Sequence, residues 1–329
     1  MANIRSVRSR RAAGVLVLAS CCLPAPVALA ASCCGGGTAS SLVLPKFSRA
    51  MVDVSADIEH YDGFWNQDGA WLPDPPGTDL NQYRLNLSYV HRFSPHWQGS
   101  ITLPYVWNSN VYAGIDSSTQ GPGDTLLSLW YEAFDTIKCV WKVRKPADLI
   151  PAAYFGAALT LPTGISPYND VENSFDITGR GFYRLDANML LDKTIYPWTA
   201  TLFLSYGTHL ERPVNREYGS YVEPYDKKLG DRKVATVSFG YTHFLESMDS
   251  VTLTIAYSRL HEDKGTIDGA TDPTTGLEKD SFTTTLAYST MDNDWIFKAS
   301  WNHTIKEDGW GANFPATDIL TLGVSHVLR

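Results

Sequence analysis

Side chains that alternate between apolar and polar, residue by residue, are the feature that most constrains this chain. Residues 83–89 read Tyr-Arg-Leu-Asn-Leu-Ser-Tyr, and residues 251–257 read Val-Thr-Leu-Thr-Ile-Ala-Tyr. Successive side chains of a β-strand point to opposite faces, so a period of two predicts strands with one apolar face. Twelve segments follow this pattern, near residues 50–60, 82–93, 97–108, 124–135, 152–162, 182–193, 198–210, 232–244, 250–262, 280–290, 295–304 and 317–328.

A targeting segment is expected at residues 1–30. Four arginines lie between Arg5 and Arg11, an apolar run follows from Ala12 to Leu23, and Ala28-Leu29-Ala30 matches a signal-peptidase site. A membrane anchor is the weaker alternative, because the run is far shorter than the ~20 apolar residues of a spanning helix. Residues 31–49 contain many Gly and Ser residues and are predicted to form a flexible periplasmic leader.

Connections between the predicted strands alternate in length. They are mostly short after even-numbered strands, as at residues 94–96 and 291–294. They are long after odd-numbered strands, at 61–81, 110–123, 163–181, 211–231, 263–279 and 305–316. Outer-membrane barrels have an even strand count, short periplasmic turns and long external loops. The pattern therefore predicts that both chain ends lie on the periplasmic side. One connection, 136–149, is an exception because it is long and basic.

The expected fold is all-β: a transmembrane antiparallel up-and-down β-barrel of about 12 strands, formed by residues 50–329. A soluble sandwich would also alternate, with its polar face in water, but strands of 10 or more residues and the export signal favour a closed barrel. Aromatic residues beside the short turns are predicted to form an interfacial girdle, although strands are rich in aromatic residues in any case. They are Phe93, Trp97, Trp198, Phe244 and Trp295.

Charged residues on the polar face of the strands are the candidate functional residues, because that face would line the lumen of a closed barrel. Charges of both signs on an inner wall can set ion selectivity, or they can pair across the wall and narrow the pore. Both interpretations stay open. The predicted lumen-lining charges are Asp53, Asp57, Glu59, Arg84, Arg92, Glu132, Arg184, Asp186 and Lys298.

Three cysteines remain once the signal is removed: Cys33, Cys34 and Cys139. An odd number in an exported chain indicates one disulfide plus a single or lipid-modified thiol. Because the leader and the connection 136–149 should share the periplasmic side, we expect Cys139 to bond Cys33 or Cys34. Lipidation of the leader is the alternative.

Two stretches resemble a known family. Residues 121–131 read Gly-Pro-Gly-Asp-Thr-Leu-Leu-Ser-Leu-Trp-Tyr, and residues 159–164 read Leu-Thr-Leu-Pro-Thr-Gly. In this order they are similar to motifs of the outer-membrane barrels labelled meta-pathway phenol-degradation proteins or transporters. The resemblance spans about residues 82–328. It implies an exported barrel grouped with uptake channels for fatty acids and aromatic hydrocarbons.

Charge and motifs limit the other function classes. The formal net charge is -8, and the four arginines of residues 1–30 leave near -12 on the remainder, which argues against nucleic acid as a partner. No zinc motif, phosphate loop, dinucleotide fingerprint or haem-attachment motif occurs. The histidines have no serine at the spacing that a hydrolase needs. We therefore expect no enzyme activity, no cofactor and no metal site.

The expected function is that of a porin-like outer-membrane channel for passive transport of small molecules, hydrophobic or aromatic solutes included. Two alternatives stay open: an adhesion barrel that binds ligands through its long external loops, and a sheath around a partner electron-transfer cytochrome. The expected partners are outer-membrane lipid, lipopolysaccharide and a small-molecule solute, with a periplasmic or cytochrome partner in the second alternative. The sequence does not indicate the oligomeric state.

Overall fold

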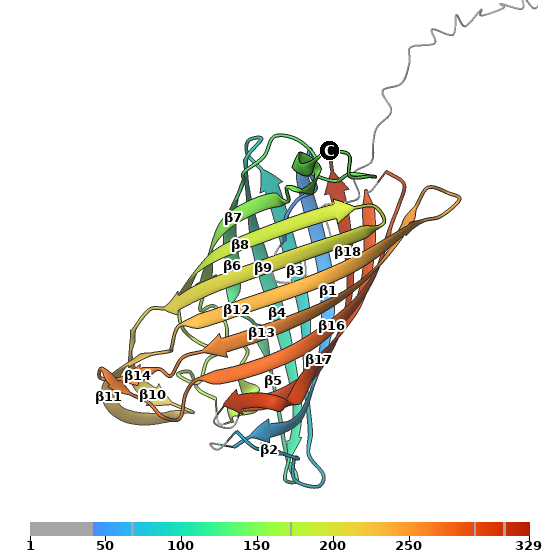
Figure 1. Ribbon diagram of the computed structural model, residues 1–329. Helices are drawn as coiled ribbons and strands as arrows, with labels where there is room; N and C mark the ends of the chain where they lie inside the picture. The colour runs from blue at the N-terminus through green and yellow to red at the C-terminus, as the bar shows by residue number, and fades with distance from the viewer. Residues whose placement is uncertain (1–41, 67–68, 172, 293, 312–313) are drawn as a thin grey trace, which may run out of the picture.

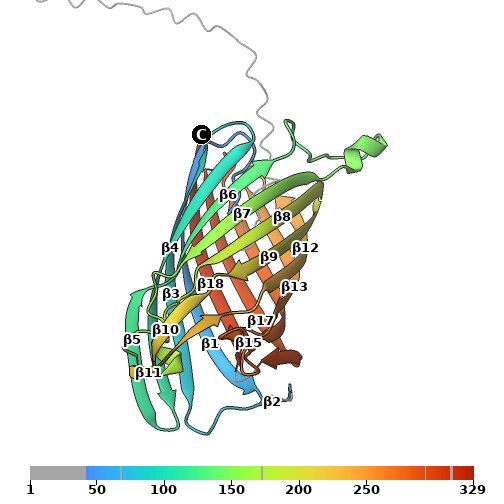
Figure 2. The same cartoon turned by 90° about the vertical axis from the view of Figure 1, so that its left-hand side faces the viewer.

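The strands form one closed antiparallel barrel in the computed structural model, which describes residues 42–329 except 67–68, 172, 293 and 312–313 (Figures 1 and 2). Each strand pairs with its neighbours, and the last strand returns to the first, with Ala50 opposite Leu328. In order around the wall the strands are β1 (Ala50–Trp65), β3 (Asp79–Arg92), β4 (Trp97–Tyr112), β6 (Thr125–Glu132), β7 (Ala152–Leu161), β8 (Arg184–Ile195), β9 (Trp198–His209), β12 (Arg232–Phe244), β13 (Ser250–Glu262), β16 (Leu277–Ser289), β17 (Trp295–Gly311) and β18 (Phe314–Leu328).

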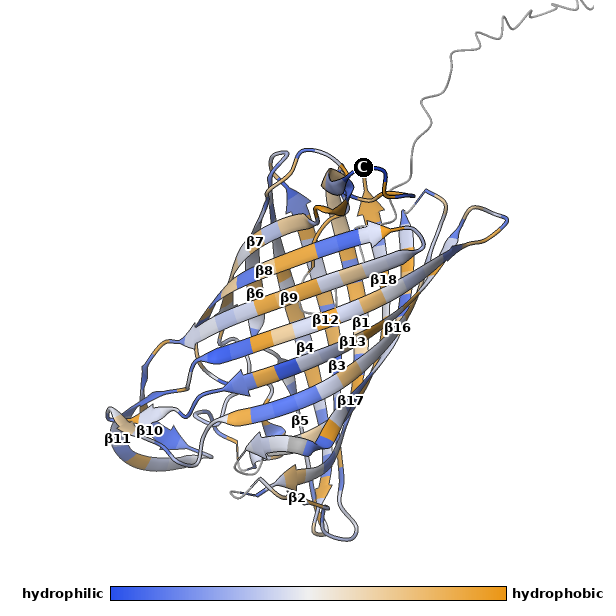
Figure 3. Cartoon of the chain, viewed as in Figure 1, coloured by the Kyte–Doolittle hydropathy of each residue, from blue (hydrophilic) through white to orange (hydrophobic). Residues whose placement is uncertain are grey.

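The predicted strands and their two faces are confirmed. Apolar side chains point outward on each strand, as with Leu87, Leu103 and Leu322, which are 48%, 46% and 55% exposed. Polar residues at inward positions, such as Ser88 on β3 and Gln98 on β4, are buried. Alternating hydropathy along the arrows is visible in Figure 3. A closed wall leaves no strand edge unpaired, and this apolar outer belt makes the barrel a transmembrane one.

Exposed aromatic side chains form two outward belts. Near the short turns lie Phe93, Trp97, Trp198 and Trp295, four of the five predicted girdle residues. Phe244 differs, because it packs against Tyr196 and Trp141. A second belt, not predicted, lies toward the other end of the strands and contains Tyr83, Tyr105, Tyr183, Tyr206, Tyr257, Phe282 and Trp301.

The long connections contain strands that the sequence interpretation treated as irregular loops. They are β2 (Trp71–Leu72), β5 (Ile115–Pro122), β10 (Arg212–Glu217), β11 (Ser220–Lys228), β14 (Thr266–Ile267) and β15 (Ala270–Thr271). β5 folds back on the outer half of β4. β10, β11, β14 and β15 form a separate small sheet beyond the barrel, at the lower left of Figure 1.

Three of these hairpins turn through a residue pair that ends in glycine. The pairs Ala113-Gly114, Tyr218-Gly219 and Asp268-Gly269 have positive φ at both positions, from 43° to 83°. Two consecutive positive φ values define the type I′ turn, whose twist matches that of the strands it joins. The connection predicted at 305–316 is also mostly strand, because β17 and β18 continue outward to Gly311 and from Phe314.

The basic connection after β6 lies at the barrel end where β1 begins and β18 ends (Figure 1). It contains a short 3-10 helix, η2 (Pro146–Leu149), and the Trp141 ring packs at a tilt against Tyr196 in the next turn at that end. Val140 pairs with Ile195 at the end of β8. Within the described part of the chain, no helix is long and apolar enough to cross a membrane.

Substitutions on the lipid-facing and lumen-facing sides of a strand should lower the free energy of unfolding by different amounts. Leu87→Arg places a charge in lipid and should lower the free energy of unfolding by about 2–4 kcal/mol, the usual cost of arginine near the bilayer midplane. Asn86→Arg, one residue away, should cost much less, because the Nδ2 of Asn86 already lies 2.9 Å from the Asp57 carboxylate. Equilibrium urea unfolding in lipid vesicles measures both values. Equal costs would contradict the assignment of faces.

Candidate functional site

The predicted lumen charges point inward, and the structure joins them in pairs. On the wall near the barrel closure, the Lys298 ammonium lies 2.9 Å from the Asp53 carboxylate. Arg84 lies 3.5 Å from Asp57 and 3.2 Å from Glu59. These contacts link neighbouring strands within the wall, so the charges on this side are largely compensated locally.

The remaining predicted charges are paired as well. Arg184 and Asp186, two residues apart on β8, are joined at 2.8 Å. Arg92 on β3 reaches Glu132 on β6 at 2.6 Å, and the Glu132 side chain is fully buried. All nine residues therefore occur in ion pairs, and the pairing gives no preference between selectivity and structural support.

Glu132 also binds the leader, which enters the barrel at this end. The Lys46 ammonium lies 2.8 Å from Glu132 and 2.7 Å from the Phe134 carbonyl oxygen. Arg92 donates hydrogen bonds to the carbonyl oxygens of Pro45 and Ser48. Two cations thus share one buried carboxylate, and this arrangement fixes the chain segment in front of β1.

Apolar contacts complete the leader's attachment. Val43 joins a buried cluster on the inner side of β6 to β9, and Leu44 joins a second cluster on the inner side of β1, β3, β17 and β18. The Leu44 N–H also donates to Gln98, at 2.6 Å. Residues 42–48 therefore cross the lumen from one wall to the other at the end where β1 begins. We call them the plug segment.

The composition had predicted flexibility throughout 31–49. Gly and Ser dominate only the part before residue 42, and the plug segment supplies Val, Leu and Lys side chains that are buried inside the barrel. Cys33, Cys34 and the signal predicted at residues 1–30 lie outside the described residues. Cys139 is partly buried in the basic connection at the same barrel end.

At the opposite end, residues 163–181 fold inward, and we call them the inward loop. Asn108 and Asn110, on the inner face of β4, donate hydrogen bonds of 3.0 Å to the carbonyl oxygens of Ile177 and Phe175. Ser117 on β5 donates to the Asp176 carboxylate, also at 3.0 Å. The loop thus lines the inner side of the β4–β5 wall.

Arg180 attaches the inward loop to the far wall. Its guanidinium donates two hydrogen bonds, of 2.6 and 2.7 Å, to the carboxylate of Glu262 at the end of β13. Burial opposes its charge, but the Glu262 carboxylate raises the pKa of Arg180 above its ordinary value. β4 and β13 are six strands apart in a ring of twelve, so the loop crosses this opening of the barrel between opposite walls.

Around the plug segment, the inner wall of the barrel is apolar on one side and polar on the other. The apolar side consists of inward residues of β6, β7, β8 and β9 that pack together with Val43: Trp130, Tyr154, Leu190 and Phe203, with Val234 of β12 against them. Opposite them stand the paired charges of β1 and β3. With the plug segment in place, the four residues of β6 to β9 on the apolar side are only 1–6% exposed.

Sequence reasoning missed the inward loop, the Arg180–Glu262 contact and the apolar patch. Arg180 lies in a stretch without periodicity, so no local pattern marks it. The apolar patch breaks the alternation, since Trp130, Leu190 and Phe203 are apolar at inward positions. That departure was a usable signal, because an apolar residue on the lumen side needs an apolar neighbour there.

Comparison with known proteins gives a likeness of fold. No family model matches the sequence, and no curated protein matches it. The COG4313 outer membrane channel from Pseudomonas putida F1 is similar with a TM-score of 0.65 at 14% identity, over 89% of this chain and 99% of that one. The β domain of the Bordetella autotransporter BrkA has a TM-score of 0.48 at 10% identity, over 85% of this chain and 100% of that one. A TM-score this low carries no argument. At these identities the likeness shows that the chain has the fold of an outer-membrane barrel.

Proposed function

We propose that this protein is an outer-membrane channel that passes small molecules by diffusion. The observation that carries the proposal is a lumen whose wall has paired charges and an apolar patch, narrowed at one end by the plug segment and at the other by the inward loop. An eight-stranded barrel is filled by its own side chains and a sixteen-stranded one is open. With twelve strands, these two segments govern passage.

The solute class we propose is small and partly apolar, aromatic molecules included. Trp130, Tyr154 and Phe203 lie in the cluster that Val43 joins, so displacement of the plug segment would offer their rings to a solute. Aromatic pairs gain about 0.5–1.5 kcal/mol beyond burial. Paired charges on the other wall would interact with a hydroxyl or carboxylate. The resemblance to phenol-degradation barrels supports the same class. Flux of phenol, benzoate and a sugar of similar size into proteoliposomes tests it, and faster entry of the sugar would contradict it.

Adhesion is the second candidate, because the small external sheet presents Tyr221, which is 84% exposed. A protein that conducts no solute yet binds a surface ligand through β10 and β11 would favour it.

Undocking the plug segment should raise conductance. Val43→Asp with Leu44→Asp places two carboxylates in apolar clusters, and burying an unpaired charge costs more than the segment's contacts provide. We expect single-channel conductance in planar bilayers to rise about twofold or more, the change expected when an obstructing segment leaves the narrowest part of a pore. Phe47→Asp is the matched control, because Phe47 is 69% exposed and should leave conductance unchanged. Unchanged conductance in the double variant would contradict the plug.

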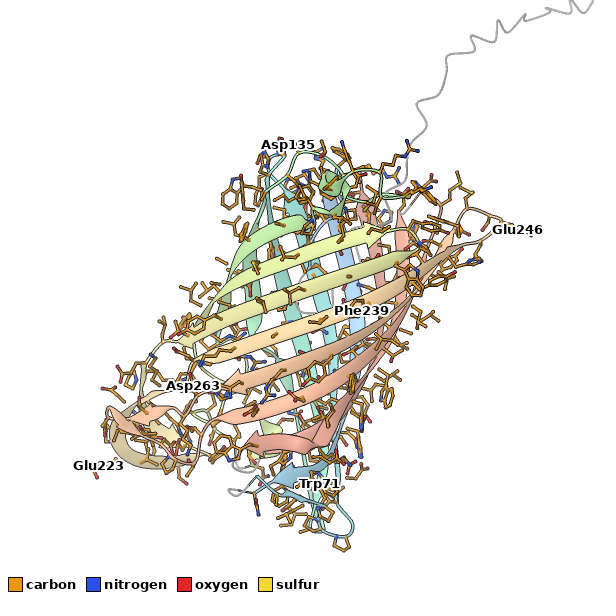
Figure 4. The ribbon with its side chains drawn as sticks, in the orientation of Figure 1. Trp71, Asp135, Glu223, Phe239, Glu246 and Asp263 are labelled. Carbon is orange, nitrogen blue, oxygen red and sulfur yellow. The ribbon has the colours of Figure 1, made fainter. Side chains whose placement is uncertain are left out.

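Neutralising one side of a lumen ion pair should change ion selectivity. Asp57→Asn with Glu59→Gln leaves Arg84 without its carboxylates, so the wall becomes more positive. The permeability ratio should shift toward anions by about twofold, which corresponds to a fraction of a kcal/mol at lumen distances. Reversal potentials in a salt gradient measure the shift. Glu223→Gln with Glu246→Gln changes charge equally outside the lumen (Figure 4) and should have no effect. If the permeability ratio of the lumen variant does not change, the ion pairs of Arg84 have a structural role only.

A further inference from the structure

The outer face of β8, β9, β12 and β13 carries a groove that the channel function does not use. Its volume is about 470 Å³. The small side chains of Ala187 and Ala235 form its floor, and Met189, Leu204 and Tyr206 form its apolar walls. These strands cross the front of Figure 1, with their outward side toward the viewer. The groove therefore opens toward lipid.

Strand register places cations at one end of this groove. Ala187 pairs with Tyr206, Tyr206 with Lys233, and Lys233 with His261, so these four side chains form one row across the wall. In the adjacent row, Leu204 pairs with Ala235 and Ala235 with Arg259. Lys233 is the second residue of β12 and His261 the second-last of β13. The cations therefore stand at the external ends of the strands.

Two tyrosines mark the boundary between apolar and polar surface here. Tyr206 donates its O–H to Asp231, and Tyr257 donates to Asp280 at 2.7 Å. Rings that are apolar on one side and hydrogen-bonded at the tip lie at the level of lipid head groups. The groove below them is then at acyl-chain depth, and the cations above are at head-group depth.

The rim carries charges of both signs, and Arg259 also lies 3.7 Å from Asp280. Lys233 lies 3.0 Å from Asp263, and Arg259 pairs with Glu278. His261 lies 3.0 Å from Asp263 and 3.5 Å from Glu278. The side chains of Lys233 and Arg259 are 51% and 56% exposed, and ammonium and guanidinium groups carry three and five N–H donors, so both keep donors for a ligand. The carboxylates keep acceptor positions for hydroxyl groups.

We propose that this groove is a binding site for lipid A, the lipid anchor of lipopolysaccharide. One acyl chain lies over Ala187 and Ala235 between Leu204 and Tyr206. A phosphate of the head accepts hydrogen bonds from Lys233 and Arg259, and sugar hydroxyls donate to Asp263 and Glu278. A head that offers both phosphate and hydroxyls fits a rim of mixed sign better than a bare phosphate does. The external position selects the outer leaflet, where lipid A resides.

Native mass spectrometry of the full-length protein in detergent with purified lipid A tests the site. Lys233→Gln with Arg259→Gln should weaken lipid A retention by roughly tenfold or more, the value of a lost charge-assisted hydrogen bond. Lys142→Gln with Arg144→Gln removes two exposed cations at the periplasmic end and is the matched control, with retention unchanged. Ala235→Phe fills the groove and should lower retention with the cations in place.

Further controls separate the outcomes. Ala299→Phe makes the same change at another outward alanine, on β17, and should leave retention intact. Each variant is first shown to fold by its heat-dependent shift in gel mobility. Retention that survives Lys233→Gln with Arg259→Gln, or that survives Ala235→Phe, would overturn the proposal. Phosphatidylethanolamine or phosphatidylglycerol held as tightly as lipid A would also overturn it. Bilayer conductance, measured on the same samples, reports on the channel independently.

Discussion

Pairing of the first strand with the last is the constraint on which the rest of the molecule depends. Lipid offers no hydrogen-bond partners, so a barrel with an open seam would leave a row of backbone groups unsatisfied. β1 and β18 close that seam from Ala50 opposite Leu328 outward. Asp53 and Asp57 strengthen it from the inside, through Ser325 and Thr321 of β18 and Lys298 of β17. The acidic side chains of β1 thus belong to the closure as well as to the lumen.

Closure also determines where the plug segment lies. Because the plug segment directly precedes β1, its last residues must lie at the seam. Arg92 on the adjacent strand β3 donates hydrogen bonds to its carbonyl oxygens. Glu132, three strands from β1 around the ring, accepts Lys46 from the other side. A buried carboxylate that loses a cationic partner is strongly destabilised. Lys46 and Arg92 therefore both contribute to holding the plug segment in place.

Period-two alternation was enough to predict twelve strands, their order and their faces, because in a barrel each residue's environment depends mainly on its parity. Contacts between distant segments could not be predicted this way. Nothing local relates Arg180 to Glu262 or Lys46 to Glu132. The hairpins in the long connections could have been predicted, because Asp268-Gly269 is a strong type I′ turn signal within one of them. The charged residues of the candidate site were predicted from the sequence. The two segments that narrow the lumen were not, because their contacts join residues that are far apart in the chain.

The inward loop has a mechanical consequence. It is hydrogen-bonded to β4 and β5 on one side and, through Arg180, to β13 on the opposite side. A segment attached at both ends of a diameter acts as a strut, and it resists flattening of the ring along that direction. Flattening the ring along that direction would therefore require these hydrogen bonds to break.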